Sequence, residues 1–172
     1  MRNKKKEWLS SVSRANFERE GFLIFRNCLG VEICEEARTF VLDSLKPLIG
    51  PAELEVDVGY PGGPVGDIDA GSETPRRLLH AYGRAPIMRQ MAFHENVRRV
   101  IYELMEDKSV MLSQCHHNCV MTKFPKYSSI TGWHQDIRYW HFDLPELISV
   151  WIALDREDES NGALKLIPGS HK

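Results

Sequence analysis

Apolar residues recur at helical spacing in three stretches of the first hundred positions. Residues 12–20 form a short helical pattern that ends at Gly21, because glycine commonly closes a helix. A longer amphipathic pattern covers residues 33–48, and a third begins near Pro86 with a clear apolar stripe over residues 97–105. The first part of the chain is therefore predicted to be mostly helical, with the longest helix covering a sheet.

The second part of the chain has short apolar runs and alternating patterns that are typical of strands. With one early run included, we predict strands at residues 22–25, 110–124, 131–139, 148–154 and 163–167. Helices first and strands later indicate an α+β or mainly β fold whose sheet or barrel holds any functional site. We expect one domain over residues 1–172, with a helical part at 1–108 and a strand part at 109–172.

Residues 57–75 are rich in Gly, Pro and Asp and predict a long loop. A loop of this length in a compact domain is either functional or disordered, so an active-site flap and plain disorder both stay open. Arg76 and Arg77 follow it. A solvated basic pair is the favoured interpretation, and a cation for a cosubstrate or substrate carboxylate is the alternative.

Composition and charge narrow the class of protein. The chain has 172 residues, of which 42% are hydrophobic and 27% charged, as in an ordinary globular protein. The net charge of -2 gives no sign of nucleic-acid binding. No apolar run approaches the ~20 residues that span a bilayer, and no secretory signal is visible. We expect a cytoplasmic protein, a monomer or weak homo-oligomer, with neither nucleic acid nor membrane as partner.

The cysteines allow a zinc site as a minor alternative. The segment Cys115-His116-His117-Asn118-Cys119 concentrates zinc-binding residue types, but no second ligand pair of the C-x-x-C kind accompanies it. Buried reduced thiols in a strand are the favoured interpretation.

The motif Trp133-His134-Gln135-Asp136 is the sharpest chemical feature of the sequence. Side chains alternate along a strand, so His134 and Asp136 should point to one face and Gln135 to the other. An imidazole and a carboxylate are two of the three ligands in the 2-His-1-carboxylate triad that binds iron. A lone H-x-D motif is more often a surface or structural feature, so its surroundings decide its meaning.

Those surroundings resemble a known family. The sequence contains GWHQD at 132–136, RYW at 138–140, ISVWIAL at 148–154, NGAL at 161–164 and IPGSHK at 167–172. This ordered run resembles the phytanoyl-CoA dioxygenase family of iron/2-oxoglutarate oxygenases, over about residues 115–172.

The resemblance implies a double-stranded β-helix (jelly roll) with the N-terminal helices packed on one sheet. It implies Fe(II) bound by His134, Asp136 and a distal histidine, with 2-oxoglutarate as cosubstrate. Such enzymes use molecular oxygen to hydroxylate an unactivated C–H bond of a small organic substrate, and they release succinate and carbon dioxide. The substrate itself stays open among fatty acyl, amino-acid-derived and secondary-metabolite compounds.

The resemblance also assigns residues around the metal. Cys119, Met121 and Lys123 share one face of the predicted strand 110–124, and the family pattern places them near 2-oxoglutarate. For Cys119 and Met121, filling of the barrel is an equal alternative. Trp151 matches a family position that contacts 2-oxoglutarate, with core packing as the alternative, while the apolar positions of residues 148–154 should face the helices.

Two aromatic residues directly follow the predicted metal strand. Tyr139 and Trp140 are candidates for a wall of the substrate site. The alternative is that they only close the end of the barrel.

The sequence lacks two parts that the family requires. A distal histidine and an arginine for the far carboxylate of 2-oxoglutarate normally follow the Pro-Gly-Ser-His segment, and the chain ends at Lys172. We therefore expect a C-terminally truncated domain with reduced affinity for iron. One alternative is a non-catalytic or truncated member that acts as a binding or pairing module. Another is a cupin-like metal-binding protein with His171 as the third ligand.

Overall fold

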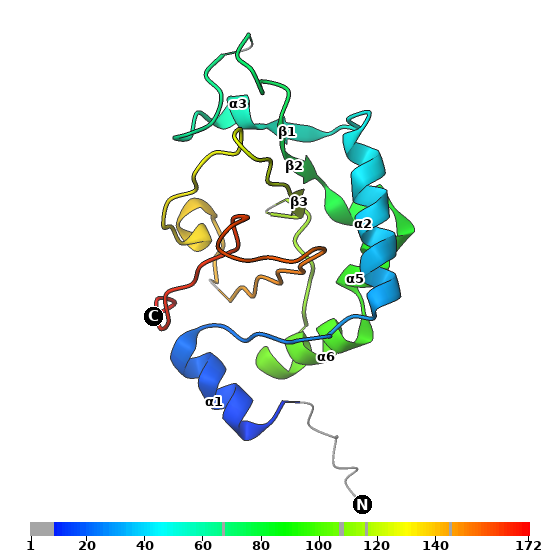
Figure 1. The fold of residues 1–172 in the computed structure, drawn as a ribbon. Helices are drawn as coiled ribbons and strands as arrows, with labels where there is room; N and C mark the ends of the chain where they lie inside the picture. Colours follow the sequence, from blue (N-terminus) through cyan, green and yellow to red (C-terminus); the bar gives the residue numbers. More distant parts are fainter. Residues whose placement is uncertain (1–8, 67, 107–108, 116, 145) are drawn as a thin grey trace, which may run out of the picture.

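Helices form most of the regular structure in the first part of the chain (Figure 1). The computed structural model describes residues 9–66, 68–106, 109–115, 117–144 and 146–172. Its helices are α1 (Ser11–Glu20), α2 (Val31–Leu45), α3 (Glu55–Val58), α4 (Ala81–Arg84), α5 (Pro86–Ala92), α6 (Glu95–Leu104) and the 3-10 helix η1 (Asp136–Tyr139). The predicted helices correspond to α1, α2 and, for the third pattern, to α5 and α6 together. Within the described ranges, none of these helices is long and apolar enough to cross a membrane.

Short strands form one antiparallel sheet, in the order β1 (Ala52–Leu54), β2 (Pro75–Leu79) and β3 (Cys119–Met121). Leu78 of the central strand β2 lies opposite Ala52 of β1 on one side and opposite Val120 of β3 on the other. Leu78 is fully buried. Of the strand predicted at residues 110–124, the described residues form only β3.

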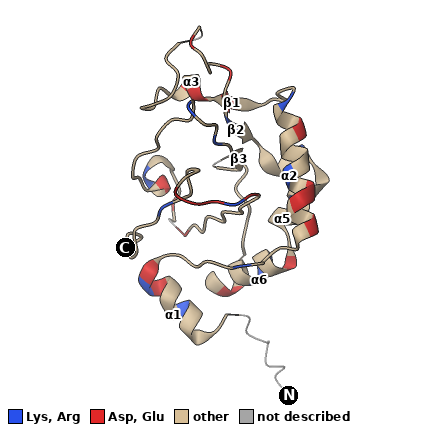
Figure 2. Ribbon diagram, viewed as in Figure 1, with Lys and Arg blue, Asp and Glu red and all other residues tan. Residues whose placement is uncertain are grey.

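The hydrophobic core lies where α2 and α5 pack against each other, next to the sheet. On α2 the buried residues Ala37, Val41 and Ser44 are spaced by four and three positions, so they share one face of the helix. That face meets the cluster Leu29, Ala85, Ile87, Met88 and Met91, to which Val120 of β3 adds its side chain. Figure 2 marks acidic residues along α2, and Glu32, Glu35, Glu36 and Asp43 of this helix are exposed.

The C-terminal residues pack against the end of α1. Gly21 closes α1 with a φ of 86°, a left-handed conformation that glycine adopts without steric cost. The backbone N–H of Gly169 donates to the carbonyl of Glu20 at 2.8 Å. Figure 1 accordingly shows the red end of the chain near the blue helix α1.

Most of the predicted strands do not form. The described residues between 122 and 172 contain no strand, and η1 is their one helix, so the predictions at 131–139, 148–154 and 163–167 are wrong. Residues 22–25 are also irregular. A strand needs a neighbour that satisfies its backbone N–H and C=O groups, and periodicity along the chain cannot supply one.

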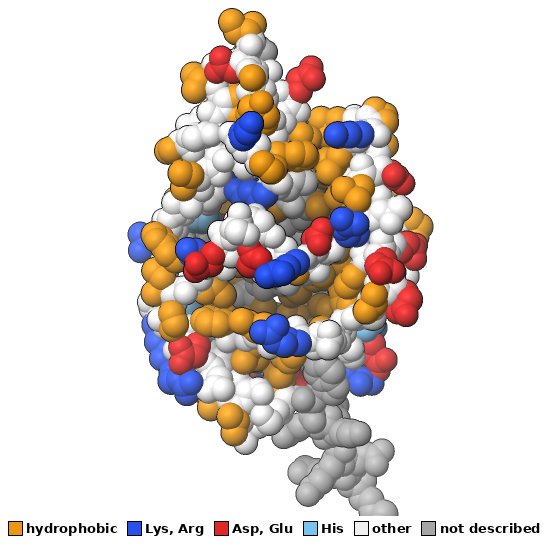
Figure 3. Space-filling model, in the orientation of Figure 1, with side chains coloured by type: hydrophobic (Ala, Val, Ile, Leu, Met, Phe, Trp, Pro, Cys, Tyr) orange, Lys and Arg blue, Asp and Glu red, His pale blue; other side chains and the backbone are white. Residues whose placement is uncertain are grey.

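The second part of the chain nevertheless keeps some of the expected sidedness. Ile152 and Leu154 pack against the core cluster, whereas Trp151, directly before Ile152, is 49% exposed. Many large apolar side chains of this part remain accessible, and hydrophobic side chains are spread over the face shown in Figure 3. Helices with a small antiparallel sheet agree with the predicted α+β class, while the described residues do not form a jelly roll.

Candidate functional site

The side chains of His134 and Asp136 face each other. His134 Nε2 lies 3.3 Å from Asp136 Oδ1, and His134 Nδ1 lies 2.8 Å from the carbonyl oxygen of Gly132. A carbonyl oxygen can only accept a hydrogen bond, so this contact requires the proton on Nδ1 and leaves a lone pair on Nε2 of the neutral ring. Two acceptors that face each other at this distance are favourable only with a proton or a cation between them.

The pair fits two adjacent positions around a metal ion. Imidazole and carboxylate ligands lie roughly 2.0–2.2 Å from a metal, so neighbouring octahedral ligands are about 3 Å apart. The observed separation of 3.3 Å is close to this value. Over the described ranges of the chain, no group of three His, Cys, Asp or Glu side chains could hold a metal ion. The convergence of His134 and Asp136 is thus found, and their role as iron ligands stays a prediction.

An extended residue followed by a 3-10 turn brings the pair together. Gln135 has strand-like angles of φ -122° and ψ 117°, and η1 begins at the next residue. The side chain of Gln135 points to other partners, since its amide donates to the Ser170 carbonyl and its Oε1 accepts from Arg138 Nε at 2.9 Å. The predicted alternation is therefore correct for these three residues, although the strand does not continue.

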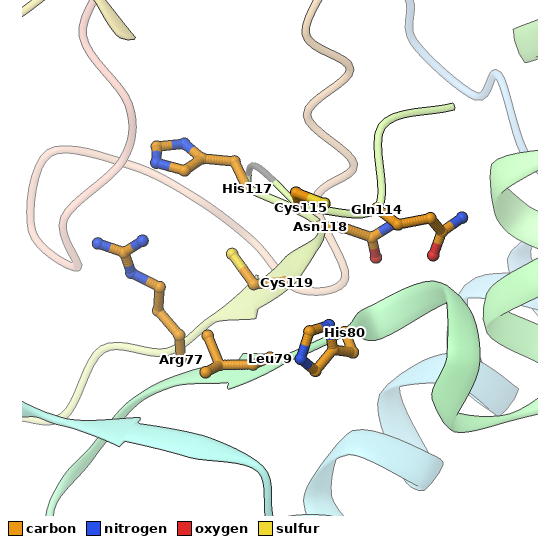
Figure 4. Close-up of a pocket in the computed structure, with 8 residues that line it drawn as sticks. All are labelled: Arg77, Leu79, His80, Gln114, Cys115, His117, Asn118 and Cys119. Atoms are coloured by element: carbon orange, nitrogen blue, oxygen red, sulfur yellow. The ribbon is translucent and has the colours of Figure 1, made fainter. Parts of the chain in front are cut away.

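A cavity of about 280 Å³ lies beside the pair, between β2, β3 and the residues that precede β3 (Figure 4). Its lining residues are Arg77, Leu79, His80, Gln114, Cys115, His117, Asn118 and Cys119. In Figure 4 the side chains of Arg77, Cys119 and His117 extend to the same side. His117 Nδ1 is 3.4 Å from Asp136 Oδ2, so the wall of the cavity adjoins the pair.

Cys119 and Met121 lie on one face of β3, as predicted, while Lys123 follows the strand. The sulfur atoms of Cys119 and Met121 are 3.9 Å apart. Burial raises the pKa of the Cys119 thiol, and the charge of Arg77 only partly opposes this effect, so the thiol is neutral at pH 7. Lys123 is exposed, and its Nζ donates to the Ser129 carbonyl at 3.1 Å.

The three aromatic candidates differ in their placement. Trp151 Nε1 donates to the carboxylate of Glu157 at 2.9 Å, which directs this ring to a surface partner. Tyr139 is 69% exposed, with its ring centroid 6.5 Å from that of His134. The Trp140 ring stands edge-on to His117, at 5.0 Å between centroids. Tyr139 and Trp140 are therefore brought next to His134 and to the histidine that contacts Asp136, whereas Trp151 is paired with Glu157.

Arg76 is buried, which overturns the prediction of a solvated basic pair. It lies on β2 and is 2% exposed, with NH1 3.5 Å from Glu55 Oε2 and Nε 3.1 Å from Glu53 Oε1. Its NH1 also donates to Ser129 Oγ at 2.8 Å, and its guanidinium stacks on the Tyr60 ring. Arg76 thus joins the loop after α3 to the segment that leads to His134 and Asp136.

Glu55 is the buried acidic partner in this cluster and is 0% exposed. Burial raises the pKa of its carboxyl, but hydrogen bonds from Ser129 and Ser128, together with the charge of Arg76, outweigh burial and lower it. The residues next to Glu55 in the sequence give no sign of this role. Its partner Ser129 lies 74 positions away, and no local pattern signals such a contact.

His171 does not join His134 and Asp136. Its Nε2 lies 3.2 Å from the carbonyl oxygen of Glu18, and its ring covers the bare Cα of Gly21. In the part of the chain that the structure describes, no group of three His, Cys, Asp or Glu side chains could hold a metal ion, with or without His171. The alternative with His171 as third ligand is therefore wrong for this structure.

The cysteine segment gives no support for zinc. Cys115 and Cys119 are free thiols that line the cavity with His117, and His116 lies outside the described residues. Counting only described residues, no cluster here could hold a metal ion.

Comparisons with known proteins agree on one family. Residues 17–172 match the model of the phytanoyl-CoA dioxygenase (PhyH) family. A probable phytanoyl-CoA dioxygenase from Caenorhabditis elegans is 24% identical over 95% of this chain and 53% of its own length. Ectoine dioxygenase from Sphingopyxis alaskensis is 22% identical over 95% of this chain and 50% of its own length.

A shorter match reaches a third kind of dioxygenase. A probable alpha-ketoglutarate-dependent hypophosphite dioxygenase from Stutzerimonas stutzeri is 34% identical over 33% of this chain and 20% of its own length. No solved structure matches the chain. The chain spans about half the length of the first two relatives. The match over residues 17–172, together with these dioxygenase relatives, shows that the chain belongs to the phytanoyl-CoA dioxygenase family.

Proposed function

We propose that this chain contributes His134 and Asp136 to the iron site of a 2-oxoglutarate-dependent dioxygenase that hydroxylates an unactivated C–H bond of a small organic molecule. The observation that carries the proposal is the facing pair at 3.3 Å, within a chain that belongs to the phytanoyl-CoA dioxygenase family. The name of the hypophosphite relative supports 2-oxoglutarate as cosubstrate. When bound, Fe(II) would activate oxygen, and 2-oxoglutarate would be converted to succinate and carbon dioxide.

The other predicted residues have defined roles in this proposal. Cys119 and Met121 line the 2-oxoglutarate side of the site, and Lys123 supplies a positive charge near it. Trp151 contacts 2-oxoglutarate, whereas Tyr139 and Trp140 form part of the substrate wall. In the present structure Lys123 and Trp151 bind Ser129 and Glu157, so both proposed roles require these side chains to leave their present partners.

The test is iron-dependent formation of succinate. The purified chain would be supplied with Fe(II), 2-oxoglutarate and oxygen, and succinate would be measured with and without candidate substrates. We expect turnover that His134→Ala and Asp136→Asn abolish. His141→Ala, a change of an exposed histidine five positions after Asp136, should preserve it. Absence of both iron binding and succinate in the unchanged chain would refute the proposal.

A second candidate is a non-catalytic or truncated family member that acts as a binding or pairing module. One observation favours it: among the described residues, no group of three His, Cys, Asp or Glu side chains could hold a metal ion. This candidate predicts weak metal binding without succinate. A cytoplasmic location and a monomeric or weakly oligomeric state remain predictions.

A further inference from the structure

His117 lies between the candidate metal pair and the ring of Trp140. Its Nδ1 is 3.4 Å from Oδ2 of Asp136, whereas Oδ1 of the same carboxylate is 3.3 Å from His134 Nε2. The two carboxylate oxygens are thus divided between two imidazoles. One oxygen faces the place where a metal ion would bind, and the other is in contact with His117.

A ring contact and an uncommon backbone conformation place His117 beside Asp136. The ring stands edge-on to Trp140, with an angle of 81° between the ring planes, and Trp140 packs edge-on to Phe142 in turn. The backbone of His117 has a φ of 47°, in the left-handed region that residues other than glycine seldom adopt. Such conformations cost about 1–3 kcal/mol and cluster at functional sites. The Trp140 ring thus supports the His117 ring beside Asp136, while 43% of the His117 side chain is exposed.

We propose that His117 is a positioning residue for the metal-binding carboxylate of Asp136. By holding Oδ2, it fixes the carboxylate plane so that Oδ1 and His134 Nε2 are presented to one ion. Groups that hydrogen-bond to metal ligands orient them, and their removal typically costs about 10–100-fold in metal affinity. This role rests on the proposed function, because it requires a metal at His134 and Asp136.

The test uses Co(II), whose visible absorption bands report ligand geometry. The dissociation constant and the absorption spectrum would be measured for the unchanged chain and for His117→Phe, which keeps a ring against Trp140 but lacks Nδ1. We expect binding about 10–100-fold weaker, with altered bands. His80→Phe is the matched control, because His80 lines the same cavity and has a similar φ of 56°. We expect it to bind Co(II) as the unchanged chain does.

A second pair of variants separates the contact from packing and folding. Asn and Leu have similar shapes, and the asparagine side chain has a polar atom near the place of Nδ1. We expect His117→Asn to bind Co(II) within a few-fold of the unchanged chain and His117→Leu to bind as weakly as His117→Phe. Circular dichroism would confirm that each variant is folded. If His117→Phe does not fold, the comparison of His117→Asn with His117→Leu decides the test.

The outcomes separate this inference from the proposed function. If the unchanged chain binds Co(II) and the Phe and Leu variants match it in affinity and spectrum, the role of His117 is refuted and the metal site stands. If the unchanged chain gives no saturable Co(II) spectrum, the metal site itself is refuted, and the role of His117 with it.

Discussion

Removing Arg76 should destabilise the protein strongly, because Arg76 neutralises a carboxylate that water cannot reach. Glu55 is 0% exposed and Arg76 is 2% exposed, so solvent does not compensate either charge. Breaking a buried ion pair by replacing one partner costs about 3–5 kcal/mol. For Arg76→Met, which keeps most of the side-chain volume, we expect the free energy of unfolding to fall by an amount in this range. That is a large part of the roughly 5–15 kcal/mol by which domains are stable.

A double-mutant cycle isolates the charge contribution. Glu55→Gln alone leaves Arg76 with Glu53 at 3.1 Å and with Ser129 Oγ at 2.8 Å, so we expect a smaller loss, about 1–3 kcal/mol. The double variant leaves no buried carboxylate at position 55 without a partner. Its loss should therefore be smaller than the sum of the two single losses, with a coupling energy of about 0.5–3 kcal/mol.

The assay is urea unfolding followed by tryptophan fluorescence, since Trp133 and Trp140 lie in the segment that Arg76 holds. Arg38→Met is the matched control, because Arg38 pairs with Asp155 at 3.0 Å with both side chains largely exposed. Exposed pairs contribute about 0–1 kcal/mol. If Arg76→Met lowers the free energy of unfolding no more than Arg38→Met, the argument from burial is wrong.

Two further predictions concern acid stability and the end of α1. The pKa of Glu55 is lowered in the folded state from its ordinary 4.5, so its ionised form stabilises the protein above that value. This contribution should be lost as the pH falls below 4.5 through the folded pKa, and unfolding curves for Glu55→Gln should depend less on pH in that range. Gly21 and Gly59 both have positive φ, so an alanine is strained at either position. Gly21→Ala should nevertheless destabilise the protein more than Gly59→Ala, because only at Gly21 would the new Cβ approach His171 Nδ1 within 3.0 Å. Equal shifts in melting temperature would show that His171 can move away without cost.

Sequence patterns predicted correctly those features that depend on residues close to one another in the chain. Helix α1 and its end at Gly21 follow from spacing and from the conformational freedom of glycine, and α2 follows from its buried face. The convergence of His134 and Asp136 also depends on one extended residue between them, so alternation predicted it even though the strand was wrong.

The rest depended on contacts between distant residues, which no local pattern records. Whether residues 131–139 and 148–154 pair as strands depends on a neighbouring strand, and the three-strand sheet β1-β2-β3 provides none for them. Arg76 became buried because Ser129, 53 positions further on, and the Glu55 carboxylate surround it. The family, the helices α1 and α2 and the convergence of His134 and Asp136 could be predicted from the sequence, because each depends on a short stretch of chain. The burial of Arg76 and the contact between His117 and Asp136 could not, because desolvation and charge pairing arise only when distant segments pack together.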